Sequence, residues 1–136
     1  CGSGEYKNRV ILPSFDEEGY CNFFTSRTHD PNVWPPYMNG PGNKDIIFNE
    51  LLIDWEREVT LVEGVFDAIV AGENSIPLLG STLREDSKLF MKIVRNDTSV
   101  LLGLDADAQK KAMRLVKALL PFIDSDTYLM RIALSA

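Results

Sequence analysis

Hydrophobic residues change their spacing partway along this chain, and the change divides the sequence into two parts. In the first part, short apolar segments at residues 9–13 and 20–25 flank turn-forming residues 16–19, which predicts a β-hairpin. Residues 28–44 are rich in proline, asparagine and glycine, so neither a helix nor a central strand is expected there. We expect an ordered loop whose aromatic residues, such as Trp34, pack against the rest of the protein.

After residue 46, short apolar runs alternate with segments of helical periodicity, which is typical of β-α units around a parallel sheet. The predicted strands are residues 59–62, 76–79, 100–104 and 128–133. The predicted helices are residues 66–71, 84–94 and 108–120. The sequence therefore predicts an α/β domain at residues 57–136, preceded by a small, mostly β lobe at residues 1–56.

Length and composition limit the classes of protein that fit this pattern. The chain has 136 residues, of which 45% are hydrophobic, enough for one compact unit with a core. No apolar run reaches membrane length and no basic leader precedes one, so we expect a cytoplasmic protein that makes no membrane contact. Cys1, Cys21 and the single His29 do not form a recognisable zinc motif, and both cysteines are expected to be free thiols.

The formal charge of −6 argues against a protein that coats nucleic acid through a general positive field. Clustered carboxylates also give a negative total in metal enzymes, where bound divalent cations supply positive charge at the point of contact with a polyanion. A nucleic-acid substrate is therefore compatible with this charge, provided that the contact is local.

Acidic residues follow two of the predicted strands, at the end where parallel sheets bind ligands. Glu63 ends one strand, Gly64 permits a tight turn, and Asp67 falls in the first turn of the next helix. Asp105 and Asp107 follow another strand and can face one point, because residues two apart in an extended chain point to the same side. Such oxygen ligands suit Mg²⁺, although helix capping and solvation are the alternative roles.

A third predicted strand ends at Gly80, so three strand ends converge on one rim. The motifs at this rim are Glu63-Gly64 with Asp67, Leu79-Gly80-Ser81 and Asp105-Ala106-Asp107. In this order they resemble the Toprim domain of bacterial-type primases, type IA and II topoisomerases and several nucleases. The resemblance implies that Glu63, Asp105 and Asp107 are catalytic and bind Mg²⁺ or Mn²⁺, two ions in all, with Asp67 as a further ligand.

Segments before Glu63 resemble the amino-terminal lobe of the catalytic core of bacterial- and phage-type DNA primases. These segments are Arg9-Val10-Ile11-Leu12-Pro13, Asp16 to Gly19, Asn22-Phe23-Phe24, Ser26-Arg27, Tyr37-Met38-Asn39 and Ile47-Phe48-Asn49-Glu50. The resemblance covers most of the chain and implies synthesis of short RNA primers from ribonucleoside triphosphates on a single-stranded DNA template. It assigns nucleic-acid or nucleotide binding to Lys7, Arg9, Arg27, Tyr37, Asn39, Gly64 and Gly80.

The chain departs from the family pattern at three positions. Ala106 replaces the glycine between the aspartates, Gln109 replaces a glycine after them, and Pro36 stands where the family has a lysine. Parts of a primase that contact a replicative helicase are also not recognised in this sequence. Two alternatives stay open: a Toprim nuclease or nicking enzyme, and a non-catalytic module that binds single strands.

Overall fold

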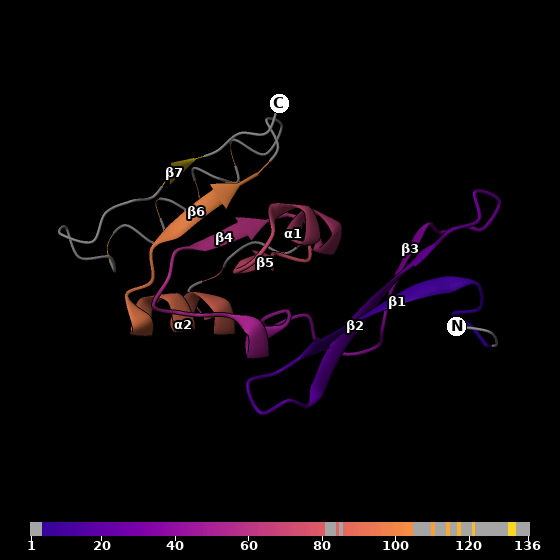
Figure 1. Ribbon diagram of the computed structural model, residues 1–136, viewed down its shortest axis with the longest axis horizontal. Coiled ribbons are helices and arrows are strands. Elements are labelled where there is room, and N and C mark those ends of the chain that lie inside the picture. The colour runs from indigo at the N-terminus through magenta and orange to yellow at the C-terminus, as the bar shows by residue number, and fades with distance from the viewer. Residues whose placement is uncertain are drawn as a thin grey trace.

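The computed structural model describes residues 4–80, 84, 86–104, 110, 114, 117, 121 and 131–132. Two sheets lie side by side in it, an antiparallel sheet ordered β1-β2-β3 and a parallel sheet ordered β5-β4-β6-β7 (Figure 1). The strands are β1 (Arg9–Phe15), β2 (Cys21–Thr28), β3 (Tyr37–Asn39), β4 (Val59–Val62), β5 (Ser75–Pro77), β6 (Val100–Gly103) and β7 (Arg131–Ile132). The helices are the 3₁₀ turn η1 (Glu50–Leu52) and the α-helices α1 (Val65–Ala71) and α2 (Lys88–Asn96). The predicted α/β architecture with a small preceding β lobe is confirmed.

The predicted hairpin is formed by β1 and β2, and its turn is held by one carboxylate. Asp16 Oδ1 accepts hydrogen bonds from the backbone N–H groups of Glu18 (3.0 Å) and Tyr20 (2.9 Å), and Gly19 adopts a φ of +89°. A glycine takes that backbone conformation without steric cost, so the sequence at this turn fixes the register of the two strands.

The segment at residues 28–44 differs from the prediction in two ways. It contains β3, which pairs with β2, so the prediction of a loop throughout was wrong. Prolines are tolerated next to β3 because this three-residue strand is at the edge of its sheet. Trp34 is 85% exposed and does not pack as expected, whereas Tyr37 packs edge-on against Phe66 and nearby Phe48 is buried.

The second sheet follows the prediction closely in its strands. Strand β4 has the predicted bounds, and β5 and β6 lie within a residue or two of theirs. Helix α2 begins later than predicted, at Lys88, because the Ser87 hydroxyl caps it by accepting the N–H of Phe90 at 3.2 Å. The predicted helix at residues 108–120 lies outside the described residues, except for three that are helical and exposed: Lys110, Arg114 and Lys117. Among the described residues, no helix is long and apolar enough to span a membrane.

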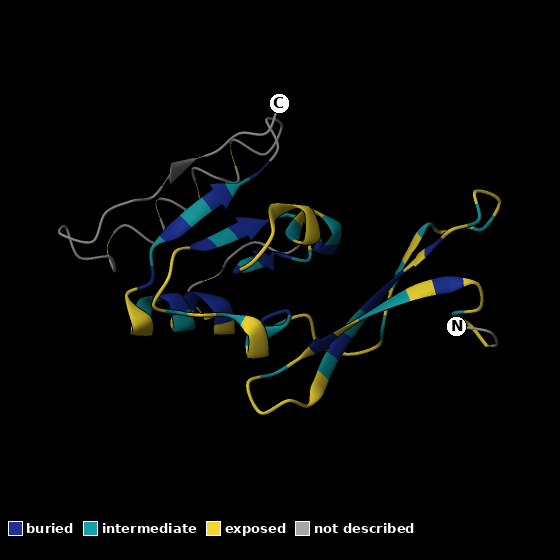
Figure 2. Ribbon diagram, viewed as in Figure 1, coloured by how far each residue is buried: buried dark blue, intermediate teal, exposed yellow. Residues whose placement is uncertain are grey.

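The main hydrophobic core lies between the parallel sheet and α2, as the buried positions in Figure 2 show. The segment before β4 contributes to this core through Ile47, Ile53 and Trp55. A second cluster joins the two sheets through Phe23 of β2, Phe48 and Val65 of α1. The segment between the two sheets therefore packs against both of them. The predicted domain boundary after residue 56 lies beyond Ile47 and Ile53 of this segment, and it remains a prediction.

A salt bridge also connects the two lobes. Lys92 Nζ of α2 lies 2.8 Å from Glu17 Oε2 in the hairpin turn and 3.3 Å from Glu50 Oε1 in η1. The hydrogen bond to Glu17 raises the pKa of Lys92, with further contributions from Glu50, while burial opposes the rise. The pKa of Lys92 in the folded protein is thus above its ordinary value of 10.5. The stabilisation from this salt bridge is therefore fully present below pH 10.5 and is lost as the pH rises through the raised pKa.

We expect the substitution Lys92→Met to lower the free energy of unfolding at pH 8 by about 1 kcal/mol, because Glu50 lies in a mostly desolvated position. Urea denaturation measures this loss, and the gap between the two proteins should narrow above pH 10.5. The exposed Lys88 of the same helix provides the control Lys88→Met, which should change stability little. A gap that persists unchanged at alkaline pH would contradict an electrostatic origin.

Candidate active site

A pocket of about 390 Å³ opens between the two lobes at the carboxyl end of β4. The first sheet and the β4-α1-β5 unit both line it, with Thr25, Tyr37, Asn39, Glu63, Gly64, Val65, Phe66, Asp67, Leu79 and Gly80. Six residues that the sequence identified as site residues are therefore brought together from segments up to 43 positions apart. This convergence makes the pocket the candidate active site.

Hydrogen bonds beyond the end of β5 hold the backbone of Glu63 in place. The Leu78 N–H donates to the Val62 carbonyl at 2.8 Å, and the Leu79 N–H donates to the Glu63 carbonyl at 3.1 Å. Because these bonds extend the pairing of β4 with β5, Glu63 leaves the sheet from a fixed position. Glu63 therefore lines the pocket from a fixed backbone rather than from a free loop.

Asp67 is oriented by the start of α1. Its Oδ2 accepts the backbone N–H of Gly64 at 3.1 Å, the acidic half of a capping box. Gly64 has an extended φ of −124°, a backbone conformation that does not by itself require glycine. A Cβ at position 64 would instead lie 3.3 Å from Asp67 Oδ2, so the missing side chain leaves room for the carboxylate.

The third strand end is strained. Leu79 and Gly80 both have positive φ angles, 56° and 73°. A leucine in this conformation costs about 1–2 kcal/mol, whereas glycine adopts it freely. Leu79 is held there by packing against the cluster of Phe23, Phe48 and Val65. Gly80 therefore has a conformational role at the pocket, beyond the nucleotide contact expected from the sequence.

The carboxylates of Glu63 and Asp67 fit part of a site for a hard divalent cation, since both supply oxygen ligands to one pocket. Val62 pairs in parallel with Gly103, so β4 and β6 end at the same edge of the sheet. Asp105 and Asp107 lie outside the described residues. Within the described part of the chain, no group of three or more acidic, histidine or cysteine side chains could hold a metal ion.

The structure separates the predicted basic residues. Arg9 is 4% exposed, and its guanidinium donates to the carbonyls of Pro35 (2.6 Å) and Pro36 (3.3 Å), so it holds the segment before β3 rather than lining a groove. Lys7 is exposed and does not line the pocket. Asn39 lines the pocket while its Oδ1 accepts the Thr25 hydroxyl at 2.8 Å. The prediction of a shared basic groove is thus unsupported for Arg9.

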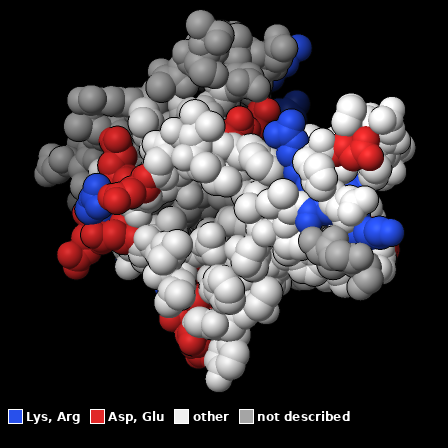
Figure 3. Space-filling view, turned by 45° about the vertical axis from the view of Figure 1, so that its right-hand side comes forward, with Lys and Arg blue, Asp and Glu red and all other residues white. Residues whose placement is uncertain are grey.

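Arg27 lies beside the pocket, over two aromatic rings that line it. Its Cζ is 5.4 Å from the centroid of the Tyr37 ring and 5.2 Å from that of Phe66. Phe66 was not identified from the sequence, where it resembles any apolar residue of a short helix. On the face that Figure 3 draws, basic and acidic side chains lie next to one another beside surface that carries neither charge.

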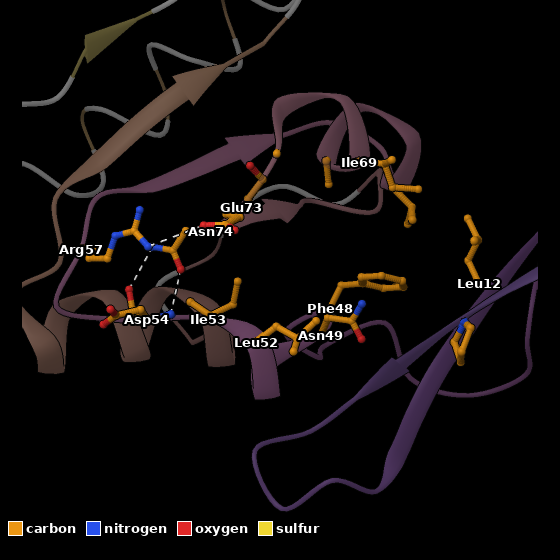
Figure 4. A pocket seen from close by; sticks show the side chains of 15 residues that line it. Leu12, Phe48, Asn49, Leu52, Ile53, Asp54, Arg57, Ile69, Glu73 and Asn74 are labelled. Carbon is orange, nitrogen blue, oxygen red and sulfur yellow. Dashed lines mark hydrogen bonds and ion pairs between the residues drawn. The ribbon is translucent and has the colours of Figure 1, made fainter.

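A larger pocket, of about 640 Å³, lies on the other side of α1 (Figure 4). Apolar side chains such as Leu12, Phe48 and Ile69 form much of its wall. Its polar end is a network in which Asn74 bonds to the backbone of Asp54. Glu63 and Asp67 do not line this larger pocket. The predicted metal chemistry is therefore assigned to the smaller pocket.

Comparison with curated proteins finds relatives of one kind, DNA primases. The chain is 29% identical over 106 residues to the DNA primase of Listeria innocua and 33% identical over 112 residues to that of Campylobacter jejuni. These matches include 67% and 73% of this chain but only 17% and 18% of the relatives. No family model matches the chain.

Solved structures agree with the sequence relatives. The E. coli primase catalytic core matches with a TM-score of 0.74 at 19% identity, over 97% of this chain and 46% of that one. A primase catalytic domain bound to single-stranded DNA matches with a TM-score of 0.76 at 19% identity, over the same shares. These likenesses establish the fold.

The chain thus has the mixed α/β fold of the primase catalytic cores, with a parallel sheet beside a small antiparallel one. In both sequence and fold, the chain matches the catalytic fragment of a bacterial-type DNA primase.

Proposed function

We propose that this chain is part of a primase that synthesises short RNA primers on single-stranded DNA. The observation that carries the proposal is the pocket between the lobes, where Glu63 and Asp67 face Tyr37 and Asn39 at the carboxyl end of β4. The proposal includes assignment of residues 57–136 to a Toprim domain that uses Mg²⁺ or Mn²⁺. Its support is the primase relatives and the oxygen ligands gathered at one sheet edge.

Each group in the pocket has a defined task under this proposal. Glu63 and Asp67, together with Asp105 and Asp107, would hold the divalent cations. When bound, these cations supply the charge that activates the attacking hydroxyl and neutralises the triphosphate. Arg27 offers a planar set of donors suited to phosphate.

The partners follow from the same proposal. A solved primase domain with this fold is bound to single-stranded DNA, which supports a single-stranded template for this chain. Ribonucleoside triphosphates are the expected substrates. Contact with a replicative helicase remains a prediction that concerns parts of a primase outside this chain.

Incubation with a single-stranded template, labelled ribonucleotides and Mn²⁺ tests the proposal. We expect short labelled oligomers from the unmodified protein and none from the double variant Asp105→Asn/Asp107→Asn, because the amides cannot neutralise the metal charge. The matched control Glu18→Gln/Glu56→Gln removes two exposed acids elsewhere and should keep synthesis. No product from the unmodified protein, or equal product from the double variant, would contradict the proposal.

A further inference from the structure

We propose that Phe66 is a positioning residue that, together with Tyr37, holds the Arg27 guanidinium at the mouth of the pocket to bind phosphate. The inference rests on the proposed function and adds to it a residue from the second lobe. Phe66 is the second residue of α1, two positions after Gly64 and one before Asp67. It is therefore tied to the same short element that orients the acidic residues.

The first lobe presents Arg27 and Tyr37 as a pair. Arg27 of β2 is directly opposite Tyr37 of β3 in the antiparallel register, so both side chains lie on one face of the sheet. Tyr37 is 50% exposed, which leaves part of its ring available to the guanidinium. The pair alone, however, gives the arginine support on one side.

Phe66 supplies the second support from the other lobe. Its ring meets that of Tyr37 edge-on, with centroids 5.8 Å apart and planes at 63°. The Arg27 Cζ lies within 5.4 Å of both centroids, inside the range of cation–π attraction. Two rings from two lobes thus restrict the guanidinium, and they also line the pocket that contains Glu63 and Asp67.

Arg27 has donors to spare for a ligand. Among the described residues, no carboxylate pairs with it, and the residue is exposed. Aromatic faces hold a guanidinium without using its N–H donors, which lie in the plane of the guanidinium group and can bind a phosphate bidentately. A charge placed beside acidic side chains would suit a phosphate that arrives together with divalent cations. The ligand is the phosphate of an incoming nucleotide or of the template strand.

A double-mutant cycle tests the inference by measuring binding of two probes, ATP with Mg²⁺ and single-stranded oligodeoxythymidylate. Phe66→Leu keeps apolar volume but removes the π face, and we expect about two- to fivefold weaker binding of one probe. The probe affected identifies the source of the phosphate. In the Arg27→Gln background the same change should have no effect, because Phe66 acts through the arginine.

Two further variants separate positioning from folding. Phe66→Tyr keeps the π face and should restore binding, whereas the control Phe15→Leu, at the end of β1 away from the pocket, should leave it unchanged. Equal losses in both backgrounds, or unchanged binding of both probes by Phe66→Leu, would overturn the inference. If unmodified protein makes no primers, the proposed function fails, but the binding cycle still decides the role of Phe66.

Discussion

Replacing Glu63 by glutamine is expected to reduce primer synthesis by about 10²- to 10³-fold while leaving the fold intact. The change keeps the size of the side chain and removes its charge. The Glu63 carbonyl accepts a hydrogen bond from the Leu79 N–H, and this bond does not involve the carboxylate. The loss should therefore appear in the chemistry and not in the free energy of unfolding.

Strand β4 offers a matched control for this prediction, because a glutamate flanks it at each end. Glu58 precedes β4 and is exposed, at the opposite end from the pocket. Glu58→Gln should retain nearly full synthesis, measured with the same template and labelled ribonucleotides. Synthesis by Glu63→Gln within threefold of the unmodified protein would remove Glu63 from the catalytic set.

A further readout distinguishes loss of metal binding from loss of substrate binding. If Glu63 is a metal ligand, its substitution should raise the Mn²⁺ concentration needed for half-maximal synthesis and leave the affinity for single-stranded DNA unchanged. An unchanged Mn²⁺ requirement combined with weaker DNA binding would place Glu63 in the template contact instead.

The order of elements could be predicted from the sequence because its signals are local. Strand β4 lies at its predicted residues, since a short apolar run bounded by charges leaves little choice of boundary. The edge strand β3 was missed because its three residues are surrounded by proline and glycine, and only pairing with β2 makes them a strand. The start of α2 depended on the Ser87 cap, which the apolar pattern does not report.

The candidate site could be predicted only in part, because the sequence reports features of neighbouring residues and not contacts between distant ones. Glu63 and Asp67 were found because they follow a strand and begin a helix, which are features of neighbouring residues. Arg9 and Arg27 look alike in the sequence, yet one is buried against two proline carbonyls and the other lies over aromatic rings at the pocket. Contacts with residues distant in the sequence, such as Pro35 and Pro36 for Arg9 and Phe66 for Arg27, decide that difference.

Asn74→Ala is the substitution from which we expect the largest loss of stability, about 3–4 kcal/mol of the free energy of unfolding. Asn74 is 9% exposed and precedes β5. Its Oδ1 accepts the Asp54 N–H at 2.7 Å (Figure 4). Its Nδ2 donates to the carbonyls of Asp54 and Glu58, both at 2.9 Å. Alanine would remove the side-chain partners of part-buried backbone groups in Asp54 and Glu58, in the segment before β4.

The backbone of Asn74 contributes separately to this loss. Its φ is 59°, a left-handed conformation that asparagine tolerates better than alanine does. Asn74→Gly relieves that strain while removing the same three hydrogen bonds, so it should cost about 1 kcal/mol less than Asn74→Ala. Urea denaturation of the two variants thus divides the loss between backbone strain and hydrogen bonding.

Asn74→Asp tests the hydrogen bonds themselves. The carboxylate keeps an acceptor for the Asp54 N–H but turns its second oxygen toward two carbonyl oxygens, so we expect it to be at least as destabilising as Asn74→Gly at pH 7. A cost below about 1 kcal/mol for Asn74→Ala would show that the network contributes little. Because Asn74 joins the segment before β4 to the start of β5, its loss should loosen both strands whose far ends carry Glu63 and Gly80.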